Sequence, residues 1–204
     1  MTKLGKLGAC ITALLLIAGC SSKPVHAGSA ARVSDTLVKQ SEVTSQLKET
    51  MAQIQATPSA AQAPDAGTIG QKIVNRLIIT DIVDRALENL GQKVTDFEVQ
   101  KLRYSVYEQY GQDVVEQQLA SAQGVPMSQI DAFFRTVLAQ GYIGSAILPK
   151  GTQQERSNAT GQYLLQLAST LEIEVAPRYG TWDPTQLQAV GVDDKLSFAQ
   201  QSAQ

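Results

Sequence analysis

The residues best suited to chemistry gather at the start of the chain. Its two cysteines and its one histidine are Cys10, Cys20 and His26. A metal site needs clustered histidine, cysteine or carboxylate ligands, and a serine or cysteine nucleophile needs a base beside it. The sequence after His26 offers neither arrangement, and it has no glycine-rich phosphate loop. We therefore expect no catalytic residue, no metal and no cofactor.

The segment before Cys20 has the pattern of an export signal. A basic region is followed by an apolar stretch, residues 9–19, that is too short to remain as a membrane-spanning helix. The stretch ends in Ile17-Ala18-Gly19-Cys20, which resembles the lipobox of bacterial lipoproteins. That resemblance implies cleavage before Cys20 and lipid attachment to its thiol. The chain is therefore expected in the bacterial cell envelope, outside the cytoplasm and anchored to a membrane.

Charge and composition bear on the remaining classes of function. The chain has 17 Lys and Arg against 19 Asp and Glu, a net charge of −2 that becomes about −4 once the two lysines of the signal are removed. There is no basic patch, so nucleic acid is not an expected partner. Asp81, Asp84 and Glu88 share one helical face with Arg85, and we interpret them as a solvated stripe rather than paired catalytic carboxylates.

The elements that must position any site are mostly helices, and the central one is residues 68–90. This is the densest apolar stretch after the signal, and its apolar face changes midway. Ile73 and Val74 point roughly opposite to Ile82 and Val83 at the helical step of about 100° per residue. Such a helix must contact partners on both sides. We favour packing against several other helices over the alternative that one half is a docking surface.

Two segments precede this helix. Residues 30–38 are predicted to form a short β-hairpin around Ser34-Asp35, and Ser41 is predicted to cap a helix behind it. Residues 56–67 contain two prolines and no large apolar side chain, which predicts a low-complexity surface loop.

Four further helices are predicted after the central one. Thr95 and Glu98 form a capping box at the start of the first. Glycines end the first two helices, and Pro126 precedes the third, whose residues from Met127 to Gly141 give the cleanest amphipathic face. The last helix is favoured to reach about residue 175, although residues 172–175 alternate as a strand would.

These segments predict a mainly α fold of about six helices with a small N-terminal β-hairpin. The expected organisation is a signal peptide (1–19), a tether (20–28), a helical domain (29–184) and a flexible C-terminal tail (185–204).

The order of the motifs resembles the N-terminal domain of SurA-type extracytoplasmic chaperones and of the related PrsA-type lipoprotein foldases. The resemblance covers roughly residues 28–184 and rests on short motifs in a shared order. They are the hairpin and helix start at residues 30–43, the apolar helix Ile73-Val74-Asn75-Arg76-Leu77-Ile78-Ile79, Val94-Thr95-Asp96-Phe97-Glu98-Val99 (similar to V-T-D-E-E-V), Gly124-Val125-Pro126-Met127-Ser128-Gln129-Ile130 (similar to G-L-S-x-E-x-F/L), and the closing turn at residues 177–183.

The chain departs from that family in one respect. Related proteins often carry a parvulin-type prolyl isomerase domain of about ninety residues, usually with histidines in its active site. Here residues 148–177 leave room for one helix only, and His26 precedes the fold. The resemblance therefore implies the chaperone domain alone.

We expect a lipid-anchored extracytoplasmic chaperone that binds unfolded or newly exported proteins through an apolar helical groove, without ATP. Two alternatives stay open: a peptidyl-prolyl isomerase, and a structural or adaptor lipoprotein that binds one specific envelope partner. Exposed aromatic side chains are the natural client contacts. The candidates are Tyr104, which lies off the apolar face of its helix, Tyr142 and Trp182.

Overall fold

The computed structural model describes residues 28–56 and 64–191. The predicted signal peptide, the predicted lipidation residue Cys20 and residues 192–204 lie outside this part of the chain. The described residues confirm a mainly helical fold with six α-helices and an N-terminal β-hairpin. The elements in chain order are β1 (Ser29–Val33), β2 (Thr36–Lys39), α1 (Gln40–Gln55), α2 (Ala66–Asn89), α3 (Asp96–Tyr110), α4 (Gln112–Gln123), the 3-10 turn η2 (Met127–Gln129), α5 (Ile130–Ile147), α6 (Gln153–Ser169), β3 (Ile173–Val175), the 3-10 turn η3 (Pro177–Tyr179), β4 (Thr181–Asp183) and β5 (Gln188–Val190).

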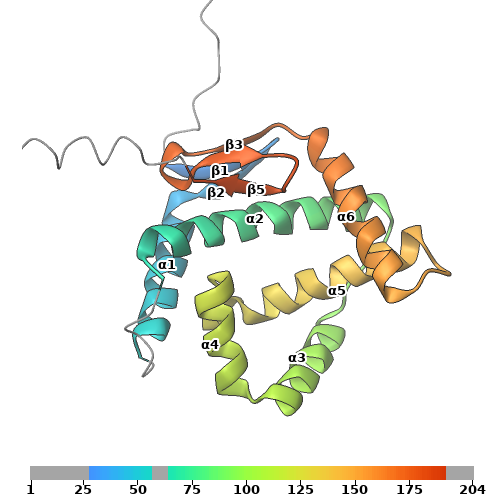
Figure 1. Cartoon of the computed structure of the whole chain (residues 1–204), viewed down its shortest axis with the longest axis horizontal. Coiled ribbons are helices and arrows are strands. Elements are labelled where there is room, and N and C mark those ends of the chain that lie inside the picture. The colour runs from blue at the N-terminus through green and yellow to red at the C-terminus, as the bar shows by residue number, and fades with distance from the viewer. Residues whose placement is uncertain (1–27, 57–63, 192–204) are drawn as a thin grey trace, which may run out of the picture.

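Helix α2 runs through the middle of the molecule, between the strands on one side and α5 on the other (Figure 1). It begins at Ala66, where the Asp65 side chain accepts a hydrogen bond from the backbone N–H of Thr68. Ile73, Ile78 and Ile82 are completely buried along it. The helix contacts α1, α4, α5, α6 and both sheets. The prediction that it packs on both sides is therefore confirmed.

The N-terminal hairpin gains a third strand from the other end of the fold. The sheet has the order β2–β1–β3 and is antiparallel, with Arg32 of β1 opposite Glu174 of β3. The Arg32 guanidinium forms ion pairs of 2.9 Å with Glu172 and 3.1 Å with Glu174. The prediction that the last helix reaches residue 175 was wrong, because α6 ends at Ser169 and residues 173–175 pair with β1.

A second, smaller hairpin lies against α2 and extends the ordered fold beyond the predicted domain end at residue 184. Strands β4 and β5 pair antiparallel, with Trp182 opposite Ala189. The Asn75 side chain of α2 accepts a hydrogen bond of 2.6 Å from the backbone N–H of Ala189. Residues 188–190, which the sequence placed in a flexible tail, are thus a strand fixed to the central helix.

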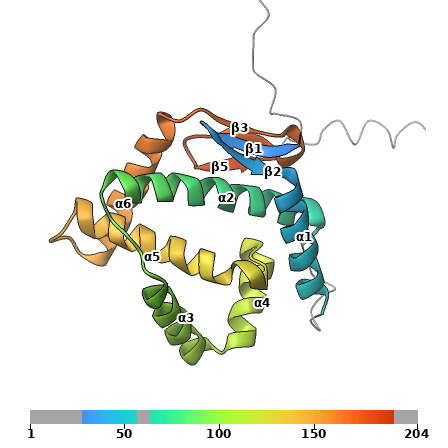
Figure 2. The ribbon, with the colours of Figure 1, turned by 180° about the vertical axis from the view of Figure 1, so that it is seen from behind.

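Helices α3, α4 and α5 form a triangle on the far side of α2 from the sheets (Figures 1 and 2). A second core fills it, in which the Phe134 ring meets the ring of Tyr107 edge-on. Ile130 and Phe134 of the predicted apolar face are buried in this core, but Met127 and Val137 of the same face are 56% and 44% exposed. Met127 lies in the 3-10 turn η2, where the α-helical period does not hold. The buried residues of α5 belong to two cores: Ile130 and Phe134 pack within the triangle, and Ala139 and Ile143 pack in the main core. None of the described helices has the length and apolar character needed to cross a membrane.

Candidate functional site

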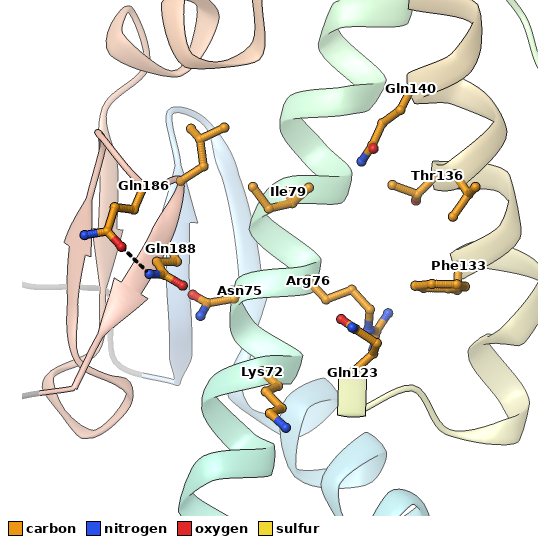
Figure 3. Close-up of a pocket in the computed structure, with 12 residues that line it drawn as sticks. Lys72, Asn75, Arg76, Ile79, Gln123, Phe133, Thr136, Gln140, Gln186 and Gln188 are labelled. Atoms are coloured by element: carbon orange, nitrogen blue, oxygen red, sulfur yellow. Dashed lines mark hydrogen bonds between the residues drawn. The ribbon is translucent and has the colours of Figure 1, made fainter. Parts of the chain in front are cut away.

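A solvent-open cleft of about 360 Å³ lies between α2, α5 and the turn of the β4–β5 hairpin (Figure 3). We call it the α2–α5 cleft. Most of its lining side chains are amides or apolar groups, and two are cations. They are Lys72, Asn75, Arg76, Ile79, Gln123, Phe133, Thr136, Val137, Gln140, Gln186, Leu187 and Gln188.

The two cations of the cleft come from successive turns of α2. Lys72 Nζ donates a hydrogen bond of 3.1 Å to the carbonyl of Ser121 on α4. Arg76 donates through one terminal nitrogen to Gln46 Oε1 of α1, and Gln46 Nε2 in turn donates to Glu42 Oε1 at 3.2 Å. The Nε of Arg76 is buried and has no partner among the described residues. Burial is the main cause that lowers the pKa of Arg76 to about 10, against a smaller opposing effect of Glu42.

The hairpin wall of the cleft is held by amide side chains of α2. Asn75 binds both backbone groups of Ala189, accepting from its N–H and donating to its carbonyl at 3.4 Å. Gln71 Nε2 donates to the carbonyls of Tyr179 and Ala189, each at 3.1 Å. These bonds pair backbone groups of β5 and of the turn η3 with side chains of α2. They fix the position from which Gln186, Leu187 and Gln188 reach the cleft.

A second hollow of about 650 Å³ continues the first along α5. We call it the α5–α6 groove. It shares Val137 and Gln140 with the cleft, so both open on one face of α5. Its far wall is α6, which approaches α5 closely at Gly144: a side chain there would lie 3.0 Å from the Arg156 carbonyl. Its lining residues are Val137, Gln140, Gly141, Ser145, Gln153, Arg156, Ser157, Thr160, Gly161 and Leu164.

The linings of the two hollows combine polar and apolar side chains. Their side chains supply amide, hydroxyl, guanidinium and ammonium groups together with apolar patches, but no carboxylate, histidine or thiol. Within residues 28–56 and 64–191 no group of three or more His, Cys, Asp or Glu could hold a metal ion. Such a surface can hydrogen-bond a polypeptide backbone and bury apolar side chains.

The three aromatic residues predicted as client contacts lie apart from one another and outside both hollows. Tyr104 is 58% exposed on α3, with the Arg103 guanidinium 5.3 Å from its ring centre. Tyr142 of α5 is half-buried, and its hydroxyl donates to Glu98 Oε1, which raises the pKa of Tyr142. Trp182 of β4 packs against the main core. Of the three, only Tyr104 presents most of its surface to solvent.

The sequence held a signal for the cleft that its aromatic residues did not provide. Lys72 and Arg76 are four residues apart, so they share a helical face, and neither has Asp or Glu at three or four residues on either side. Two cations without local counter-charges on a net-negative chain indicate a surface that could bind an external group.

No family model matches the chain, and no curated protein sequence matches it.

Proposed function

We propose that the protein is a lipid-anchored extracytoplasmic chaperone that binds unfolded or newly exported polypeptides without ATP. The observation that carries this proposal is the pair of adjoining, solvent-open hollows along α5. Two hollows that adjoin at Val137 and Gln140 and have a mixed lining suit an extended chain better than a compact small molecule. The resemblance of the motif order to SurA-type chaperones and PrsA-type foldases adds support for the same function.

The lining suggests how a client would be held. An unfolded segment presents unpaired backbone N–H and C=O groups at every residue, with side chains alternating between two sides. Gln140 and Gln123 offer amides that can both donate and accept, while Phe133, Val137 and Leu187 offer apolar contact. The proposed groove is therefore amphipathic rather than wholly apolar. Binding of this kind is sequence-tolerant, because the backbone is common to all clients.

Suppression of client aggregation tests the proposal. The chain from residue 21 onward should suppress light scattering by several chemically unfolded proteins when added at equimolar amounts. Val137→Asp places a charge where both hollows meet and should weaken the effect. Val114→Asp is the matched control, because Val114 is equally a surface valine, 58% exposed on α4 and outside both hollows.

Three results would contradict this function. No suppression across the clients would rule it out. Faster proline-limited refolding at catalytic amounts would instead favour the isomerase, and capture of one stoichiometric partner in place of many unfolded ones would favour an adaptor lipoprotein.

The proposed anchor is tested separately. Cys20→Ser should move the protein from the membrane fraction to the soluble fraction of the cell envelope. Continued tight membrane association of that variant would count against lipid attachment at Cys20.

A further inference from the structure

The two hollows along α5 carry a charge opposite to that of the chain as a whole. Lys72, Arg76 and Arg156 line them, and no Asp or Glu does. The chain nevertheless has more acidic than basic residues. A nearby hollow between α3 and α5 shows the contrast, because Asp96 and Asp131 line it beside Arg135.

Ion pairing separates the arginines of the hollows from most arginines elsewhere. Four arginines outside the cleft and the groove form ion pairs with Asp or Glu, at distances of 2.6–3.1 Å. They are Arg32, Arg85, Arg103 and Arg135.

Arg76 and Arg156 form no such pair within the described part of the chain, and Lys72 forms none there either. Arg156 instead donates to the carbonyls of Leu148 and Pro149. Arg76 is joined to Glu42 by hydrogen bonds only through Gln46, and its buried Nε has no partner among the described residues.

We propose that the α2–α5 cleft and the α5–α6 groove select extended polypeptide segments that carry carboxylate side chains beside apolar ones. This inference rests on the proposed function and names the class of client segment. A carboxylate accepts well from a guanidinium and from an ammonium group. In the cleft such a group would meet Lys72 and Arg76 with no carboxylate of the lining to repel it.

The surrounding side chains favour a peptide carboxylate over a free anion. Ile79, Phe133 and Leu187 add apolar surface to the cleft that the two cations line, and a small ion would leave that surface uncovered. Figure 3 shows Gln140 and Arg76 entering the same space from α5 and α2. A segment with an acidic residue followed by apolar residues can satisfy both walls.

The test compares two fluorescent peptides of about ten residues, one built from leucine, serine and glutamate and one with each glutamate replaced by glutamine. Binding is measured by anisotropy to the full chain in vesicles of neutral phosphatidylcholine, with protein-free vesicles as the blank. The variant is Lys72→Gln. The matched control is Lys93→Gln, which removes the same charge from an exposed residue outside both hollows.

We expect the wild-type chain to bind the acidic peptide about fivefold more tightly than the amide peptide, as a partly exposed charge pair allows. Lys72→Gln should reduce that preference to less than about twofold, and Lys93→Gln should keep it. Salt at about 0.5 M should reduce the wild-type preference as well. Circular dichroism checks that each variant is folded.

The possible outcomes distinguish the proposed carboxylate preference from the proposed binding of polypeptides. Equal binding of the two peptides to the wild-type chain would overturn the carboxylate preference and leave polypeptide binding intact. An equal loss of preference in Lys93→Gln would also overturn it, because the charge would then act at long range. Binding of neither peptide would overturn both proposals.

Discussion

Replacing Gly144 by alanine should destabilise the fold, although alanine is the better helix former. Gly144 lies in α5 where α6 crosses most closely. A Cβ atom at this position would lie 2.8 Å from Thr160 Oγ1 and 3.0 Å from both the Cβ and the carbonyl oxygen of Arg156. Ordinary contacts between carbon atoms are about 3.5–4.0 Å. Helix α6 would therefore have to move by a few tenths of an ångström, since the Cβ atom and the carbonyl oxygen of Arg156 are fixed to its backbone.

The magnitude follows from two opposing effects. Overpacking of this kind costs about 1–3 kcal/mol, and the glycine-to-alanine change in a helix returns about 1 kcal/mol. The net loss should be about 0–2 kcal/mol, the overpacking cost minus the gain in helix propensity. Gly141→Ala is the matched control, one turn earlier in the same helix, because a Cβ atom there meets nothing within 4 Å. It should stabilise by about 0.5–1 kcal/mol.

Urea unfolding followed by circular dichroism measures both variants. The two should differ by roughly 2 kcal/mol, or about 4–8 °C in Tm for a domain of this size. Displacement of α6 should also change the shape of the α5–α6 groove. If Gly144→Ala proved as stable as Gly141→Ala, the close approach of α5 and α6 would be refuted.

Three further predictions concern the core, the acid range and the hairpin wall. Ile78→Ala should cost about 2–5 kcal/mol in urea unfolding, because Ile78 is completely buried on the central helix. Hydrogen bonds from Tyr142 and Thr95 lower the pKa of Glu98 to about 2, below its ordinary value of 4.5. The stability that Glu98 contributes should thus be complete above about pH 4.5 and be lost as the pH falls toward 2. In Glu98→Gln the free energy of unfolding should therefore decrease less between these two pH values. Asn75→Leu should cost about 1–3 kcal/mol and speed hydrogen exchange at the Ala189 amide, because that N–H loses its acceptor; unchanged exchange would show that the hairpin does not depend on α2.

Local chemistry was enough to predict most helices. The capping box of Thr95 and Glu98 forms as expected, and the helix after it ends at Gly111. Helix α2 begins at Ala66, two residues before the predicted start, because the carboxylate of Asp65 caps it by accepting from the Thr68 N–H. In each case the residues that decide the boundary lie within one turn of it, so the sequence alone contains the interaction.

The errors occur where the deciding partner is distant in sequence. The alternation at residues 172–175 fits a strand, but a strand needs a neighbour, and that neighbour is β1 about 140 residues earlier. The same holds for β5, whose backbone is satisfied by β4 and by Asn75 of α2. A short segment without a visible local partner looks like a tail. Its role becomes clear only when the fold brings the partner to it.

The α2–α5 cleft depends both on residues that are close in sequence and on segments that are distant in sequence. Its walls come from α2, α4, α5 and the β4–β5 turn, and no spacing in the sequence predicts that these four segments meet. The charge of the site was nevertheless visible, because Lys72 and Arg76 share a face without a local carboxylate. This pair of cations should lower the stability of the fold, since nearby like charges repel and Arg76 loses solvation on burial. Violations of local consistency tend to fall at functional sites. An acidic segment bound between these cations would reduce their repulsion, so the same two side chains that cost stability in the fold would favour the proposed binding.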